Sequence, residues 1–157
     1  GFPVNKHNCE HLGIGAVLRL GNWANEPVVP ATLTVNVGDD RQTDIAAHFD
    51  SIVAFLEEQL QQKPGKAGSS ADCGTGVLVH CGAGISRAGT ACCAWLMHLH
   101  SIGRDEALAR LKQRREWAQP NPHFMAQLAE YEARTTKARC PGPEARRGGA
   151  PISGSGR

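Results

Sequence analysis

The sequence predicts an α/β domain in which a small mixed, mostly parallel central sheet is flanked by helices. Three observations carry this prediction. Two short apolar runs without helical period, 16–20 and 33–37, are typical of strands and end in turn residues. A third run, 77–80, has the all-apolar character of a fully buried strand, and a glycine-bearing loop connects it to an apolar helix over about 88–102.

The clearest amphipathic segment follows the second strand. Thr43 and Asp44 are both good helix N-caps, and the apolar residues after them fall on one face of a helix of about four turns. These residues are Ile45, Phe49, Ile52, Val53, Leu56 and Leu60. From 61 to 76 the chain is rich in Lys, Pro, Gly and Ser, which predicts a long flexible loop before the buried strand.

Two more helices are expected after the apolar one. Gly103 is expected to end that helix and Asp105 to cap the next, whose apolar stripe is Ala107, Leu108 and Leu111. The segment 120–122, Pro-Asn-Pro, breaks the chain before a last helix. We therefore expect one domain over 1–136 and a disordered basic tail over 137–157.

Composition narrows the class of protein. The 157 residues are 41% hydrophobic and 20% charged, as in an ordinary globular domain, and no apolar run approaches the roughly 20 residues of a membrane span. The net charge of +2 divides unevenly. Six basic residues and one acidic residue lie from Arg134 onward (+5), which leaves 11 basic and 14 acidic residues before it (−3). A mildly acidic body argues against nucleic acid as a partner.

The six cysteines do not suggest a secreted disulfide scaffold, because Cys92 and Cys93 are adjacent within an apolar helical run. The sequence also begins without a signal peptide, so we expect a reducing compartment, the cytoplasm or the nucleus. Cys92 and Cys93 are interpreted as buried helix residues; the alternative is that one of them forms a disulfide with an oxidised Cys81. The histidines show no metal-ligand spacing, and neither a metal nor another cofactor is expected.

The loop after the third strand, Cys81-Gly82-Ala83-Gly84-Ile85-Ser86-Arg87, has the features of a phosphate-binding loop. It contains no proline and no acid, so all its backbone N–H groups can point at an anion, and the following helix directs its N-terminus at the same place. A second cysteine with an arginine six residues later, Cys140 and Arg146, lacks these features, because Pro141, Pro143 and Glu144 lie between them.

The chemistry of this loop suggests nucleophilic attack on phosphorus. A helix N-terminus and inward-facing amides favour the thiolate form of Cys81. Arg87 supplies a planar, permanently charged fork that matches two phosphate oxygens. A buried structural cysteine with a surface arginine is the plainer alternative.

The stretch 77–90 resembles the signature of the cysteine-dependent protein tyrosine phosphatases, in particular their dual-specificity branch. Residues 35–49 are similar to the family's general-acid loop and the helix after it, and 120–132 to its last helix; the resemblance covers about 12–133. It implies hydrolysis of phosphotyrosine and phosphoserine/threonine through a phosphocysteine intermediate, with a phosphorylated protein as substrate and partner.

The resemblance also implies roles for individual residues. The family's general acid falls on Asp39, with Asp40 as the alternative; otherwise both are solvated turn acids. His80 is expected to hydrogen-bond the loop backbone and position Cys81, and its alternative is a satisfied core histidine. Ser86 and Thr90 are expected to support the loop.

One position departs from the family pattern. The family usually has Ser or Thr after the arginine, a hydroxyl that stabilises the leaving thiolate, whereas this chain has Ala88. The second step is therefore expected to be slow, with Ser86 or Thr90 as partial substitutes. The departure motivates an alternative function, a low-turnover phosphopeptide-binding module. A third possibility, a sulfur-transfer or arsenate-reducing enzyme, explains neither the Asp39 loop nor the last-helix match.

Overall fold

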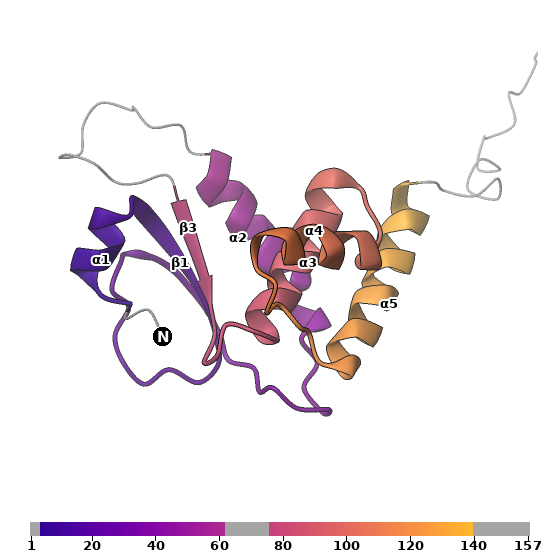
Figure 1. Cartoon of the computed structure of the whole chain (residues 1–157), viewed down its shortest axis with the longest axis horizontal. Coiled ribbons are helices and arrows are strands. Elements are labelled where there is room, and N and C mark those ends of the chain that lie inside the picture. The colour runs from indigo at the N-terminus through magenta and orange to yellow at the C-terminus, as the bar shows by residue number, and fades with distance from the viewer. Residues whose placement is uncertain (1–3, 62–75, 140–157) are drawn as a thin grey trace, which may run out of the picture.

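The computed structural model describes residues 4–61 and 76–139 and confirms the α/β prediction. These residues form three strands, five α-helices and one short 3₁₀ helix, η1 (Figure 1). In chain order they are α1 (Lys6–His11), β1 (Ile14–Leu20), β2 (Ala31–Val35), η1 (Ala46–His48), α2 (Phe49–Gln61), β3 (Gly76–His80), α3 (Arg87–His100), α4 (Arg104–Arg114) and α5 (Pro122–Arg139).

The sheet has the order β2-β1-β3, and both pairings are parallel. Leu18 of β1 lies between Leu33 of β2 and Val79 of β3. Because all three strands run the same way, their carboxyl ends meet at one edge of the sheet. The segments after them, 21–30, 36–45 and 81–86, therefore come together there, which is where ligands bind in open parallel sheets.

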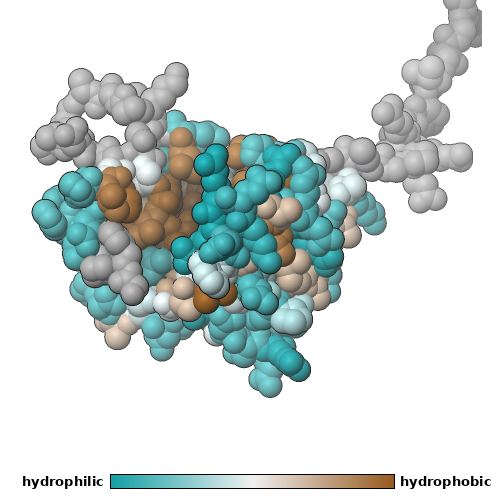
Figure 2. Space-filling model, viewed as in Figure 1, coloured by the Kyte–Doolittle hydropathy of each residue, from teal (hydrophilic) through white to brown (hydrophobic). Residues whose placement is uncertain are grey.

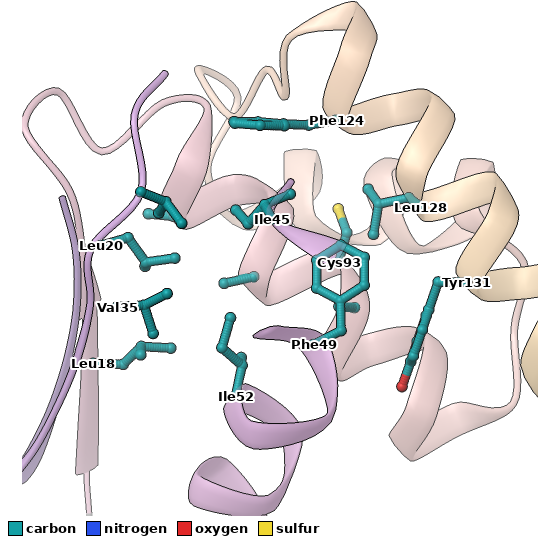
Figure 3. Close-up of a cluster of buried hydrophobic side chains, with 14 of the residues drawn as sticks. Leu18, Leu20, Val35, Ile45, Phe49, Ile52, Cys93, Phe124, Leu128 and Tyr131 are labelled. Carbon is teal, nitrogen blue, oxygen red and sulfur yellow. The ribbon is translucent and has the colours of Figure 1, made fainter. Parts of the chain in front are cut away.

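The main core lies between the sheet and the helices α2, α3 and α5 (Figure 3). Leu18, Leu20 and Val35 project from the sheet toward Ile52 of α2, and Phe49 stacks edge to face on Tyr131 of α5 with ring centroids 5.1 Å apart. Helix α1 contacts β1 on the other side of the sheet (Figure 1). This packing fixes the strand ends and the start of α3 as one rigid frame.

Several element boundaries differ from the sequence-based ones. Strand β2 begins and ends two residues earlier than expected, since the chain after Val35 leaves the sheet and runs to the loop that carries Asp39. Helix α1 was not predicted because it has six mostly polar residues and only Cys9 is buried. The expected helix after Asp44 starts as η1, where the Asp44 carboxylate accepts a hydrogen bond from the Ala47 N–H (3.1 Å).

The prediction that Gly103 ends α3, the helix after the third strand, and that Asp105 caps α4 is wrong. Helix α3 ends at His100, and its C-cap residue Ser101 has a left-handed φ of 57°. Asp105 instead pairs with its neighbour Arg104 (2.9 Å). The Arg104 backbone N–H donates to the carboxylate of Glu132 on α5 (3.1 Å), so α4 is capped from another helix. Gly103 permits this contact, because a Cβ there would lie 2.7 Å from Glu132 Oε1.

Helix α5 extends to Arg139, three residues past the expected domain boundary at 136. The rest of the predicted tail, most of the predicted loop 61–76 and the Cys140–Arg146 pair lie outside the described residues. Within the described ranges, none of the helices is long and apolar enough to cross a membrane.

Candidate active site

The phosphate-binding loop joins the end of β3 to the start of α3. Cys81 is buried, and its Sγ accepts a hydrogen bond from the Gly84 N–H (3.2 Å). Gly84 has a φ of 68°, a conformation that glycine adopts at no steric cost, and this turns its amide back toward the sulfur. From the end of α4, Arg115 Nε donates to the Gly84 carbonyl (2.9 Å) and holds the outside of the loop.

The guanidinium of Arg87 lies across the mouth of this loop. Its Nη1 donates to the Val37 carbonyl (3.2 Å), which fixes the orientation of the fork. Its Nε is buried without a hydrogen-bond partner. Nη2 lies beside Gly82, where an added Cβ would be 3.4 Å from it. Nη1 of the guanidinium is thus anchored on Val37, whereas Nη2 lies beside the loop, where it can donate to an anion held by the loop amides.

Asp39 lies beside Arg87 although the two are distant in sequence. Its Oδ1 accepts hydrogen bonds from Ser86 Oγ (2.7 Å) and from Asn121 Nδ2 (3.0 Å). Its Oδ2 is 3.5 Å from Arg87 Nε. One carboxylate oxygen is therefore held by two donors and the other faces the arginine, the place from which a proton could reach a leaving group.

Asp40 has a different environment. Its Oδ1 accepts the backbone N–H groups of Gln42 and Thr43 (both 2.8 Å), and these bonds lower the pKa of its carboxyl group. The side chain thus closes a turn. Of the two neighbouring acids, Asp39 is the one that contacts Ser86 and Arg87.

His80 lies beneath the loop at the end of β3. Its ring hydrogen-bonds the backbone of Cys81 and meets the Trp23 ring edge to face, with centroids 4.9 Å apart. Burial, with a further contribution from Arg19, lowers its pKa below the usual histidine value, so the imidazole is neutral at neutral pH. The contact is the one expected of a residue that positions Cys81; that role stays a prediction.

The hydroxyls near Ala88 are engaged elsewhere. Ser86 Oγ donates to Asp39 and accepts from the Asn121 N–H (3.1 Å), and Thr90 Oγ1 donates to the Ser86 carbonyl (2.9 Å). Both hydroxyls thus donate elsewhere in this geometry, and whether either substitutes for a hydroxyl at 88 stays a prediction. Both side chains instead hold the end of the loop and the start of α3.

Cys92 and Cys93 follow the loop on α3. Burial raises the pKa of the Cys93 thiol to about 12 and that of Cys92 to about 11, so both are protonated at neutral pH. Cys93 is fully buried, whereas Cys92 lines a groove that also reaches Cys81. Whether oxidised Cys81 can react with Cys92 stays a prediction.

Two hollows adjoin the loop. A groove of about 310 Å³ runs from the loop past β3 and α3 to Leu111 of α4 and to Arg115, which follows that helix. Figure 2 shows apolar surface on this face in the region of β3, bordered by hydrophilic residues. A second cavity, of about 240 Å³, lies between the loop and the segment after β1. The ranges 4–61 and 76–139 contain no cluster of three or more His, Cys, Asp or Glu that could hold a metal.

The sequence did not indicate Asn121 and Arg115 as site residues. Asn121 could be recognised as a helix cap, since it precedes Pro122 at the first position of α5, and its Oδ1 does accept from the Phe124 N–H (2.9 Å). Nothing local indicates that its amide nitrogen reaches Asp39, 82 residues away in the chain.

Comparison with known proteins agrees with this geometry. The family model described as dual specificity phosphatase, catalytic domain, matches residues 4–134. The chain belongs to this family. Dual specificity protein phosphatase 1B of Arabidopsis thaliana is 36% identical over 98 residues, 62% of this chain and 52% of the relative. Human dual specificity protein phosphatase 5 is 35% identical over 138 residues, 85% of this chain and 33% of the relative.

Solved structures of the dual specificity phosphatase fold also resemble the chain. The crystal structure of human DUSP28 has a TM-score of 0.70 at 27% identity and covers 85% of this chain and 87% of that one. The human tyrosine phosphatase-like serine/threonine/tyrosine-interacting protein has a TM-score of 0.68 at 26% identity, with 83% of each chain covered. The curated relatives are longer, and the chain spans about half or less of the length of those compared here.

Proposed function

We propose that this domain hydrolyses phosphotyrosine and phosphoserine/threonine in proteins through a phosphocysteine intermediate. One observation carries the proposal. Asp39, from the segment after β2, is held by Ser86 and Asn121 beside Arg87, so a nucleophile, a phosphate-binding fork and a proton donor converge on one loop. The family assignment and the fold support the same reaction class.

In the first step, the Cys81 thiolate attacks phosphorus in line with the leaving oxygen. The S–P bond forms as the P–O bond breaks, while Arg87 and the amides of the loop hold the three equatorial oxygens. Asp39, in its protonated form, gives its proton to the departing alkoxide or phenolate. The anchor of Arg87 on the Val37 carbonyl keeps the fork aligned during this step.

In the second step, water attacks the phosphocysteine. Asp39, now a carboxylate, accepts the proton of the water, the P–O bond to water forms and the thiolate of Cys81 leaves. Ala88 supplies no hydroxyl to the leaving thiolate and Ser86 and Thr90 donate elsewhere, whereas the Gly84 N–H does donate to Cys81 Sγ. We therefore expect the second step to limit turnover.

The test is hydrolysis of an aryl phosphate in EDTA by the wild type and by the variants Cys81→Ser and Asp39→Asn. The proposal expects metal-independent activity, complete loss without Cys81, and a decrease of about 100-fold or more without Asp39. Activity that survives Cys81→Ser, or that requires a divalent cation, contradicts the mechanism.

The same assay tests the alternative function, a low-turnover phosphopeptide-binding module. Ala88 is the observation that favours it, because a stalled second step would leave the domain occupied. A burst of one equivalent of phenol per enzyme followed by no measurable steady state supports this module. A sustained steady state supports the phosphatase.

A further inference from the structure

The second cavity lies between the phosphate-binding loop and the segment 21–30 that joins β1 to β2, called the β1–β2 segment below. It is lined on one side by Cys81 and Gly82, the first residues of the loop, and on the other by Arg19, Trp23 and Glu26. The cavity and the phosphate-binding loop therefore share Cys81 and Gly82. A group bound in the loop would therefore lie next to this cavity.

Arg19 is a buried cation without a counter-charge. Its relative exposure is 9%, its Nε donates to Thr34 Oγ1 and its Nη1 to the Asn25 carbonyl (2.6 and 2.9 Å). Both acceptors are neutral, and no acidic side chain of the described residues forms an ion pair with it. Burial of an unpaired charge is costly, so a buried arginine that borders a cavity marks a place for an anion.

A second polar group of the wall is a buried donor that lacks an acceptor. The indole Nε1 of Trp23 is buried without a partner; of the buried side-chain nitrogens and oxygens in 4–61 and 76–139, Arg87 Nε alone shares this state. His80, whose pKa is lowered by burial, does not supply the missing counter-charge to Arg19. Glu26 supplies the one carboxylate among the lining residues, and it is exposed to solvent on the β1–β2 segment.

We propose that this Arg19 cavity binds an anionic group of the substrate peptide, a carboxylate side chain or a second phosphate, close in sequence to the phosphorylated residue in the loop. The inference rests on the proposed function and adds a substrate class to it. The volume of about 240 Å³ suits one acidic side chain and is below the range of pockets for drug-sized ligands. An extended peptide advances about 3.5 Å per residue, so the anion lies within about three residues of the phosphorylated one.

The test compares three phosphopeptides and one aryl phosphate. The peptides have one phosphotyrosine each and differ only in flanking residues, which are neutral, acidic, or include a second phosphorylated residue. We expect the wild type to have a kcat/KM at least 10-fold higher for one or both anionic peptides, and the two arms distinguish carboxylate from phosphate. The aryl phosphate, too small to reach the cavity, reports the chemistry alone.

Three variants locate the effect. Arg19→Gln is expected to reduce the preference for anionic over neutral peptides to about twofold. Trp23→Phe keeps an aromatic ring but removes the N–H, and it is expected to weaken this preference. Glu26→Gln is expected to strengthen the preference, because it removes the competing carboxylate. Arg110→Gln makes the same substitution at an exposed arginine of α4 that pairs with Glu106, and it is the matched control.

Binding to a Cys81→Ser protein, measured by calorimetry, separates this inference from the proposed function. Tighter binding of the anionic peptides that is lost on adding Arg19→Gln supports the cavity even if the wild type proves inactive. If Arg19→Gln fails to fold, Trp23→Phe and Glu26→Gln carry the test. Equal kcat/KM and equal affinity for neutral and anionic peptides overturn the inference, as does a preference that Trp23→Phe and Glu26→Gln leave unchanged.

Discussion

Asn121 has two roles that one substitution can separate. Its Oδ1 caps α5 through the Phe124 N–H (2.9 Å), and its Nδ2 donates to Asp39 Oδ1 (3.0 Å). Serine at 121 can still cap the helix, since Ser and Asn are about equally good N-caps, but it is too short to reach Asp39. Alanine removes both contacts.

The magnitude follows from the contact that is lost. A hydrogen bond to a charged group contributes about 1.5–3 kcal/mol, and solvent weakens this one because a third of the Asp39 side chain is exposed. We take about 1.4 kcal/mol, a 10-fold decrease in kcat/KM for Asn121→Ser. Its free energy of unfolding should stay within about 0.5 kcal/mol of the wild type, whereas Asn121→Ala should lose about 1 kcal/mol of stability as well.

The assay uses two substrates and urea denaturation. The defect of Asn121→Ser in kcat/KM, which reports the first step, should be largest for a phosphoserine peptide, whose alkoxide needs a proton to leave, and smallest for an activated nitrophenyl phosphate. Wild-type kcat/KM on the phosphoserine peptide would refute the assignment of Asn121 as a positioning residue for Asp39. An equal loss on both substrates would refute it too, because it would point to general damage to the site.

Three further predictions concern single residues. Ala88→Ser should raise steady-state turnover several-fold while the burst rate stays the same, and stopped-flow kinetics in which neither changes contradict a slow second step. Gly103→Ala should displace Glu132 from the Arg104 N–H and lower the free energy of unfolding by about 1 kcal/mol, with Glu132→Gln as a near-neutral control that keeps the acceptor. Because the pKa of His80 is lowered on folding, the unfolded chain binds this proton more readily, so stability should fall as pH drops below about 6.5. Denaturation of His80→Gln at about pH 7.5 and about pH 5 should show a smaller fall than the wild type, and an equal fall shows that other groups cause it.

The strand–loop–helix arrangement around 81–87 could be predicted from sequence because its determinants are contiguous. A buried strand, a glycine-bearing loop without proline or acid, and an apolar helix are all local features of 77–102, and together they place Cys81 and Arg87 at a helix N-terminus. The same strand–loop–helix unit led to the prediction of a mixed, mostly parallel sheet, and in the structure both pairings are parallel.

Asp39 shows how far sequence reasoning extends. Its position followed from resemblance and loop placement, whereas its partners Ser86 and Asn121 come from elements 47 and 82 residues away. The wrong cap at Asp105 has the same origin, because α4 begins before Asp105, at Arg104, whose backbone N–H donates to Glu132 of another helix. Contacts between distant elements depend on how the helices pack, and local patterns do not specify that packing.

The central claim is that phosphate passes through Cys81, and trapping the intermediate tests it most directly. The wild type is mixed with excess aryl phosphate, quenched in acid within the burst and digested, and the peptide with Cys81 is examined by mass spectrometry. The mechanism predicts a phosphate adduct on Cys81 that accumulates because the second step is slow, and that is absent in Cys81→Ser. Turnover without this adduct, or an adduct on another residue, contradicts the account.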